Sequence, residues 1–269
     1  MDADASDSRK TVQLIADSFL YSDCFCLVFF ALVVIYCLVV EAGKRRFTPA
    51  SGKLYASARS TCSRKVIMAL AETGADYLFQ HIDLGKLEQK KPDYLKIQPY
   101  GKVPVWEEEN GKFRIYESRA ILKHVTAGSP IYPIDDTRFV ASIEMWMSIE
   151  YSYFQDAWKP IFVEKILKKR KDPKHVPNES LCKEKAQELL KTLDQMEEQL
   201  KLTKGYIAGD RFSIADITFI PYFQLFKPAG LEGALDSRPY LKKWRERVSE
   251  RKSWDYVNKE QVLTRRSSI

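Results

Sequence analysis

The residues best suited to chemistry lie between Gln98 and Ala120, where their types and spacing fit a small peptide. Val103-Pro104 is an X-Pro bond, the one peptide linkage that takes the cis form at modest cost, and a cis bond turns the chain sharply. Such a turn leaves the Val103 N–H and C=O facing outward, where an extended peptide can pair with them as an added strand. Glu117 suits an ammonium group, and the helix that opens at Ser118 suits a carboxylate. This stretch therefore predicts a peptide cradle.

The elements around the cradle follow an alternating order. Asn110-Gly111 separates two runs of β character and is a strong signal for a type I′ hairpin, which needs φ > 0 at both central residues. Taken with periodicity upstream, the pattern predicts a βαβ–ββα α/β unit. Its expected elements are strands 53–56, 77–83, 103–107 and 112–116 and helices 63–73 and 118–125.

Three motifs in this half resemble the glutathione site of the glutathione transferases, and most of all the plant-type phi class. They are STCSRKV at 60–66, QPYGKVP at 98–104 and YESRAI at 116–121. The resemblance covers about residues 53–257. It implies a thioredoxin-like α/β N-terminal half followed by an all-α C-terminal domain. It also implies an enzyme that conjugates glutathione to hydrophobic electrophiles or reduces organic peroxides, with glutathione as co-substrate and no cofactor.

The resemblance places the catalytic serine of the phi pattern at Ser60. A thiol has a pKa near 8.5, so only a small fraction is thiolate at neutral pH. A hydroxyl that donates to the sulfur at a helix N-terminus stabilises the anion, and lowering the thiol pKa by two units takes roughly 2.7 kcal/mol. The alternative is that Ser60 or Thr61 only caps the helix, which is worth about 1 kcal/mol.

The resemblance also assigns the glutathione contacts. The family's EHK motif appears as Glu88-Gln89-Lys90, so its histidine is replaced by Gln89, while Lys90 matches. A family glutamine is replaced by Lys102, whose positive charge can strengthen contact with a carboxylate or change the preferred peptide. The expected glutathione-binding residues are Gln89, Lys90, Lys102, Val103, Pro104, Glu117 and Ser118.

Two other classes of function stay open. The replacements at Gln89 and Lys102 also fit a non-catalytic binding or assembly module that kept the fold. A cysteine-type thiol transferase would use Cys62 instead, but such relatives carry cysteine at the position of Ser60. Cys62 lies half a turn further along and is expected to face the core.

Aromatic residues are the basis for predicting where the electrophilic substrate binds and whether the protein forms a dimer. The family fold implies an apolar electrophile pocket between the peptide half and the first long helix. The candidates for that pocket are equally core or dimer contacts: Tyr151, Tyr153, Phe154 and Trp158. Tyr100 matches a loop position that inserts into the partner subunit in related transferases, so a homodimer is expected, with a half-buried loop aromatic as the alternative.

The C-terminal half reads as helical. A helix bearing Phe139 and Ile143 is expected to run towards Pro160, followed by a charged loop at 168–177 and further helices. Ser213 and Asp216 form an expected capping box, which has a structural role.

A long apolar segment precedes the α/β unit. Residues 24–40 carry no charge, and residues 19–42 are long enough to span a bilayer at about 1.5 Å per residue. Lys44, Arg45 and Arg46 follow it, so the positive-inside rule predicts that the C-terminal side faces the cytosol. A cleaved signal peptide is the alternative, although the preceding region is long and acidic rather than short and basic. The sequence predicts a single transmembrane anchor.

Composition excludes several classes of partner. The net charge is +7, yet the basic residues are dispersed apart from Lys168 to Lys171 and Lys174, so no nucleic acid is expected. The five cysteines form no disulfide framework, and the three histidines lie far apart, so a reducing compartment and no metal site are expected. The expected segments are an acidic tail 1–18, an anchor 19–42, a basic linker 43–52, a glutathione-binding domain 53–126, a linker 127–136, a helical domain 137–258 and a basic tail 259–269.

Overall fold

The computed structural model describes residues 47–259. The proposed anchor at 19–42, the acidic tail before it and residues 260–269 lie outside the described residues. Within 47–259, each helix is too short or too polar to cross a membrane.

The N-terminal half is built on a four-stranded mixed sheet with the order β2-β1-β3-β4. β1 pairs in parallel with β2, whereas β3 runs antiparallel to both β1 and β4. Leu54 and Ala56 point to the same face of β1 and are fully buried in the main hydrophobic core. The strands are β1 Ser51–Ala56, β2 Asp76–His81, β3 Val105–Glu108 and β4 Phe113–Tyr116.

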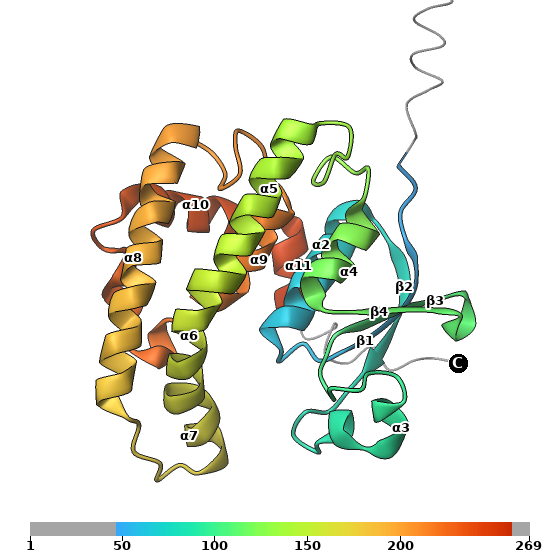
Figure 1. Cartoon of the computed structure of the whole chain (residues 1–269), viewed down its shortest axis with the longest axis horizontal. Coiled ribbons are helices and arrows are strands. Elements are labelled where there is room, and N and C mark those ends of the chain that lie inside the picture. The colour runs from blue at the N-terminus through green and yellow to red at the C-terminus, as the bar shows by residue number, and fades with distance from the viewer. Residues whose placement is uncertain (1–46, 260–269) are drawn as a thin grey trace, which may run out of the picture. The chain divides into compact units, whose positions relative to one another are not determined.

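Helices α2 and α4 lie between this sheet and the helical half (Figure 1). Helix α2 begins at Thr61, two residues before the predicted start, because the Ser60 side chain caps it by accepting a hydrogen bond from the Ser63 N–H. It ends at Thr73, and its C-cap is Gly74, whose φ of 67° is accessible to glycine at little cost. The helices of this half are α2 Thr61–Thr73, η1 Glu88–Lys90, α3 Pro92–Leu95, η2 Glu109–Gly111 and α4 Ser118–Thr126.

The β3–β4 connection is longer than the predicted two-residue turn. Asn110 and Gly111 do have positive φ, as the Asn-Gly signal requires, but Glu109 has it as well. Because Glu108 pairs with Phe113, the loop spans residues 109–112. The Asn-Gly pair therefore predicted the position of the turn correctly, but the predicted two-residue type I′ turn is wrong.

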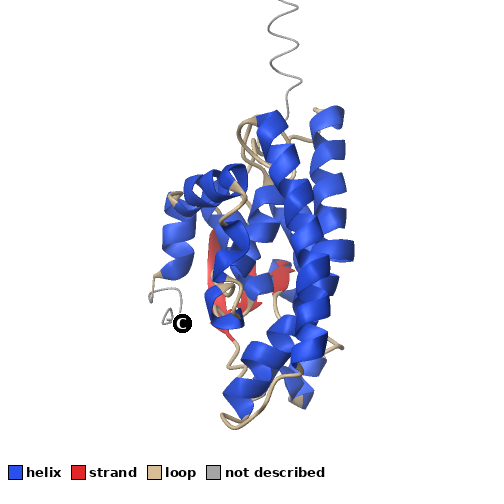
Figure 2. Ribbon diagram, turned by 90° about the vertical axis from the view of Figure 1, so that its left-hand side faces the viewer, coloured by secondary structure: helices blue, strands red, loops and turns tan. Residues whose placement is uncertain are grey.

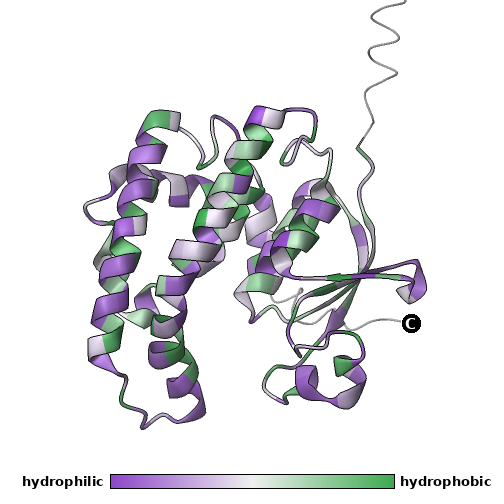
Figure 3. Cartoon of the chain, viewed as in Figure 1, coloured by the Kyte–Doolittle hydropathy of each residue, from purple (hydrophilic) through white to green (hydrophobic). Residues whose placement is uncertain are grey.

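The second half is helical and lies against the side of the sheet covered by α2 and α4, so that Figure 2 shows the strands behind helices. Hydrophilic and hydrophobic residues alternate along α8, which presents one face to the core (Figure 3). The elements are α5 Thr137–Ile149, η3 Glu150–Phe154, α6 Gln155–Phe162, η4 Val163–Leu167, α7 Lys168–Lys171, α8 Glu179–Thr203, α9 Ile214–Phe223, η5 Lys227–Ala229, η6 Glu232–Leu235, α10 Pro239–Ser249 and α11 Lys252–Asn258.

The segment from α5 to α7 corrects two expectations. The helix continues past Pro160, and two π-helical turns, η3 and η4, join its parts. Pro160 lies inside α6, where its missing backbone donor removes one helical hydrogen bond without ending the helix. Residues Lys168–Lys171, expected in a loop, form the last helical turn of this segment.

Helix α9 is buried along its whole length and holds the helical half together. The predicted capping box is confirmed: Ser213 caps the helix, and Asp216 accepts a hydrogen bond from the Ser213 N–H at 2.9 Å. Asp216 also accepts from the Ile207 N–H at 2.9 Å and from Trp244 Nε1 at 2.7 Å. The bond from Trp244 connects α9 to α10, and the bond from Ile207 connects α9 to the loop that precedes it. Burial of the Asp216 carboxyl group raises its pKa.

Candidate active site

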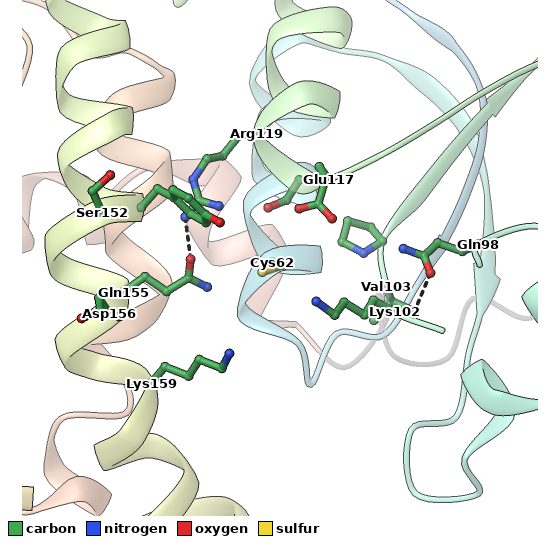
Figure 4. Close-up of a pocket in the computed structure, with 13 residues that line it drawn as sticks. Cys62, Gln98, Lys102, Val103, Glu117, Arg119, Ser152, Gln155, Asp156 and Lys159 are labelled. Carbon is green, nitrogen blue, oxygen red and sulfur yellow. Dashed lines mark hydrogen bonds between the residues drawn. The ribbon is translucent and has the colours of Figure 1, made fainter. Parts of the chain in front are cut away.

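A cavity of about 700 Å³ opens between the sheet half and helix α6 (Figure 4). Five residues predicted to bind glutathione line it, although they come from two separate stretches of sequence. They are Lys102, Val103, Pro104, Glu117 and Ser118. The cradle inferred from the 98–120 stretch therefore forms one wall of a real cavity.

The loop before β3 is held rigidly on the cavity wall. The Val103-Pro104 bond is cis, as predicted. The Lys102 N–H donates to Gln98 Oε1 at 3.1 Å, and the Tyr94 hydroxyl donates to the Lys102 C=O at 2.7 Å. Among the described residues, nothing pairs with the backbone N–H and C=O of Val103, which leaves both available to an extended ligand.

The start of α4 forms the next part of the same wall. Glu117 has a φ of 69°, a left-handed conformation that is costly for a residue with a side chain and is often found where a site demands it. Ser118 follows as the first residue of α4 and is buried. The first N–H groups of a helix lack intrahelical partners, so this corner suits a carboxylate beside the Glu117 side chain.

Gln89 and Lys90 do not line this cavity. They lie in η1, which packs on the 98–102 loop from outside. The Lys90 ammonium donates to the Tyr100 C=O at 3.0 Å, and a side chain at Gly101 would clash with the Gln89 C=O. Gln89 Oε1 is buried and has no partner among the described residues. In this arrangement both residues support the loop that carries Lys102.

The structure separates Ser60 from Cys62. Ser60 is half-buried at the N-cap of α2, and its hydroxyl accepts from the Ser63 N–H at 3.3 Å. It is absent from the lining of the large cavity, whereas Cys62 forms part of that lining (Figure 4). The expectation that Cys62 faces the core is therefore wrong. At the second position of α2 its side chain points toward the cleft between the two halves.

The wall opposite the cradle is polar, which corrects the expected apolar pocket. It is formed by one face of η3 and α6 and consists of Tyr151, Ser152, Gln155, Asp156 and Lys159. Of the four aromatic candidates, only Tyr151 lies here. Phe154 and Trp158 are buried in the core, and Tyr153 lines a separate groove beside α8. Only one of the four aromatic residues faces the cavity because helical residues one or two positions apart point in different directions.

A buried ionic cluster lies behind the cavity where the two halves meet. Glu150 Oε1 accepts from Lys65 Nζ at 2.9 Å and from the Tyr222 hydroxyl at 2.6 Å, and both charged side chains have no exposed surface. Glu150 Oε2 accepts from Arg119 Nε at 2.7 Å, and Arg119 donates in turn to Gln155 at 3.0 Å. Burial, followed by the Glu150 charge, raises the pKa of Tyr222 well above its usual range. The cluster holds Arg119 and Gln155 in place on the cavity wall.

Three residues that line the cavity were not predicted from the sequence: Arg119, Gln155 and Lys159. Arg119 follows Ser118 directly and could have been found as the next residue of the helix start. Gln155 and Lys159 share a helical face at i, i+4 spacing, but nothing in sequence tied that face to the cradle. Within residues 47–259, no group of His, Cys, Asp and Glu side chains is arranged to hold a metal ion.

Two family models match the chain. The glutathione S-transferase N-terminal domain matches residues 50–127, and the glutathione S-transferase C-terminal domain matches residues 155–252. A probable glutathione S-transferase, GSTF1, of Oryza sativa subsp. japonica is 31% identical over 75% of this chain and 92% of its own length.

Solved structures have the same architecture. Glutathione transferase F7 from Populus trichocarpa is 30% identical, with a TM-score of 0.70 over 76% of this chain and 96% of its own. Glutathione S-transferase I from maize, in complex with an atrazine glutathione conjugate, is 26% identical, with a TM-score of 0.69 over 77% and 96%. The chain therefore belongs to the glutathione S-transferase family and is of the phi-like type.

Proposed function

We propose that this glutathione transferase uses Ser60 to activate the thiol of glutathione, which it then conjugates to electrophilic small molecules. The observation that carries the proposal is the cavity wall in which an unpaired strand-like backbone at Val103 meets the strained Glu117 and the start of α4. The maize relative was solved in complex with an atrazine glutathione conjugate, which supports glutathione conjugation as the activity of this chain.

Each part of the tripeptide has a complementary group on this wall. The Val103 backbone pairs with the extended main chain of glutathione. Glu117 receives the α-ammonium of its γ-glutamyl end, and Ser118 with the first N–H groups of α4 receives the neighbouring carboxylate. Lys102 attracts the glycine carboxylate, while Gln89 and Lys90 hold the Lys102 loop from behind.

Ser60 supplies the chemistry. Its hydroxyl donates a hydrogen bond to the sulfur, and the N-terminal end of the 13-residue helix α2 adds partial positive charge. Both effects favour the thiolate over the thiol, so the bound thiol has a pKa below about 8.5. The thiolate then attacks an electrophile held beside it, and proximity contributes much of the remaining rate.

Cys62 motivates a second candidate, because it faces the cavity and Ser60 does not line it. In a cysteine-type thiol transferase, the Cys62 thiolate would attack a glutathione mixed disulfide and release the other thiol. A second glutathione would then release the first as glutathione disulfide. This chemistry needs Cys62 and does not need Ser60.

The test compares full-length wild type with Ser60→Ala and Cys62→Ser, using glutathione and 1-chloro-2,4-dinitrobenzene. Ser60→Ala is expected to lower kcat/KM by about 10- to 1,000-fold and to move the pKa of the bound thiol back toward about 8.5. Cys62→Ser is expected to retain conjugation. Loss of activity only in Cys62→Ser would favour the thiol transferase. Glutathione binding without turnover in wild type would favour a non-catalytic module.

We further propose a homodimer. The support is Tyr100, which matches a loop position that inserts into the partner subunit in related transferases; it is 63% exposed, and Tyr153 is 64% exposed, so both side chains are accessible to a second copy. Tyr153 borders an apolar groove between α5 and α8 that could receive such a side chain from a second copy. Sedimentation of wild type and Tyr100→Glu at several concentrations tests this, and a monomeric wild type at micromolar concentration would refute it.

Residues 19–42 are proposed to anchor the enzyme in a membrane, with residues 43–269 in the cytosol. The support is the uncharged run at 24–40 and the basic cluster at 44–46 that follows it. Extraction of membranes with alkaline carbonate tests the anchor. An anchored protein stays in the pellet, and release into the supernatant would contradict the proposal.

A further inference from the structure

A second cavity, of about 270 Å³, also borders the N-terminal turn of α2. It draws its walls from parts of the chain far apart in sequence: the β1–α2 loop, the α6–α7 segment, the turn after α9 and the end of α11. Its volume lies just below the range of drug-sized ligand sites, which is about 300–1,000 Å³. The space therefore suits a ligand of one aromatic ring or similar size.

The cavity combines an apolar surface with a concentration of positive charge. Phe162, Leu225 and Val257 provide the apolar surface. Three arginines, Arg59, Arg64 and Arg170, also line it, and no aspartate or glutamate does. A concave site lined by one sign of charge focuses its field on a ligand of the opposite sign.

The arginine charges are not neutralised locally. Arg59 and Arg170 are exposed, and neither guanidinium group has an ion-pair or hydrogen-bond partner among residues 47–259. Arg64 stacks on Trp254 at 4.9 Å and donates through Nη2 to Asn258, but its Nε has no partner. Burial alone lowers the pKa of Arg64, with no carboxylate to oppose it. An anion bound here would therefore meet two free guanidinium groups and a third fixed one.

The cavity lies next to the proposed nucleophile site. Arg59 directly precedes Ser60, and the Arg64 N–H donates to the Ser60 C=O at 3.0 Å. Cys62, on the same turn of α2, faces the large glutathione cavity instead. Along the chain, Ser60 therefore lies between Arg59, which lines the second cavity, and Cys62, which lines the large one. A thiolate held at the Ser60 hydroxyl would be a neighbour of Arg59 and Arg64.

We propose that the arginine-lined cavity takes the second substrate and selects electrophiles that carry an anionic group on an apolar body. A carboxylate, sulfonate or phosphate shares the required chemistry. The inference rests on the proposed function and specifies its acceptor. With an aryl chloride as acceptor, the glutathione thiolate forms a carbon–sulfur bond, the carbon–chlorine bond breaks, and chloride leaves with the electron pair.

The test uses two acceptors that differ only in the carboxylate para to the chlorine, 1-chloro-2,6-dinitrobenzene and 4-chloro-3,5-dinitrobenzoate. The measured quantity is the ratio of kcat/KM for the anionic acceptor to kcat/KM for the neutral one, in the full-length protein. Arg59→Gln and Arg170→Gln are each expected to lower this ratio by about tenfold, since each removes one charge-assisted hydrogen bond to the anion. Using a ratio cancels effects on glutathione binding and on thiol activation.

Two further variants make the result specific. Arg245→Gln removes the same charge from the exposed face of α10, at a position that lines neither of the two cavities, and is expected to leave the ratio unchanged. Lys159→Gln removes a cation from the large cavity. A ratio that falls in Lys159→Gln but not in the two arginine variants would place the anion in the large cavity and overturn the proposal. A ratio unaffected by both arginine substitutions would overturn it as well.

A binding measurement separates failure of this inference from failure of the proposed function. Calorimetry with 3,5-dinitrobenzoate and 1,3-dinitrobenzene, which have no leaving group, needs no turnover. Weaker binding of the benzoate in Arg170→Gln, by about tenfold relative to the neutral compound, supports the anion site even if neither acceptor is conjugated. Equal affinity in wild type and Arg170→Gln refutes the anion site even if the neutral acceptor is conjugated.

Discussion

Replacing Glu150 with alanine would break the buried ionic cluster that joins the two halves of the protein. Glu150 and Lys65 have no exposed side-chain surface, and their charged atoms are 2.9 Å apart. After Glu150→Ala, the Lys65 ammonium keeps only the Tyr222 hydroxyl, at 2.9 Å, as a partner in the core. The substitution therefore leaves an uncompensated charge in a place that water does not reach.

The expected cost follows from that burial. Breaking a buried ion pair by removing one partner costs about 3–5 kcal/mol. For a domain of this size each kcal/mol lowers Tm by about 2–4 °C, so Tm should fall by about 6–20 °C. A second contribution comes from Arg119, which loses its 2.7 Å bond to Glu150 but remains partly solvated.

Thermal unfolding of the full-length protein in mild detergent, followed by circular dichroism, measures the effect. Glu150→Leu combined with Lys65→Met removes both charges and should cost clearly less than the sum of the single substitutions, because neither partner is left charged and alone. A loss below about 3 °C in Glu150→Ala, or simple additivity in the double variant, would refute the reasoning.

Two further predictions concern pH and the glutathione loop. The pKa of Glu164 is lowered to about 2, and the largest cause is the hydrogen bond that its carboxylate accepts from Lys168. Because the unfolded value is about 4.3, this stabilisation is complete above about pH 4.5 and is lost as the pH falls toward 2. The Tm of wild type should therefore fall more steeply between pH 5 and 3 than that of Glu164→Gln, and equal slopes would contradict this. In Gly101→Ala, the new Cβ would lie 2.6 Å from the Gln89 C=O, so the loop must move and KM for glutathione should rise several-fold. Gly74→Ala is the control, since it has a similar positive φ and no neighbour within 4 Å; an equal rise in KM there would refute the steric explanation.

The cradle could be predicted because its features are local. A cis bond needs the proline at 104, and a left-handed turn favours the glycine at 111; both requirements act over a few residues. The capping box at Ser213 is equally local, since three residues of spacing define it. The exact turn at 109–112 escaped prediction because strand register, and not the Asn-Gly pair alone, sets the loop length.

By itself the sequence determined the family motifs, the α/β order and the residues of the cradle, because these depend on short-range backbone rules. Only the tertiary structure decided which way Cys62 points and which aromatic residues are core. It alone brought Lys65 to Glu150 across 85 positions and gathered Arg59, Arg64 and Arg170 around one cavity. In a sequence, a charge destined for burial looks the same as a charge on the surface, and only packing distinguishes them.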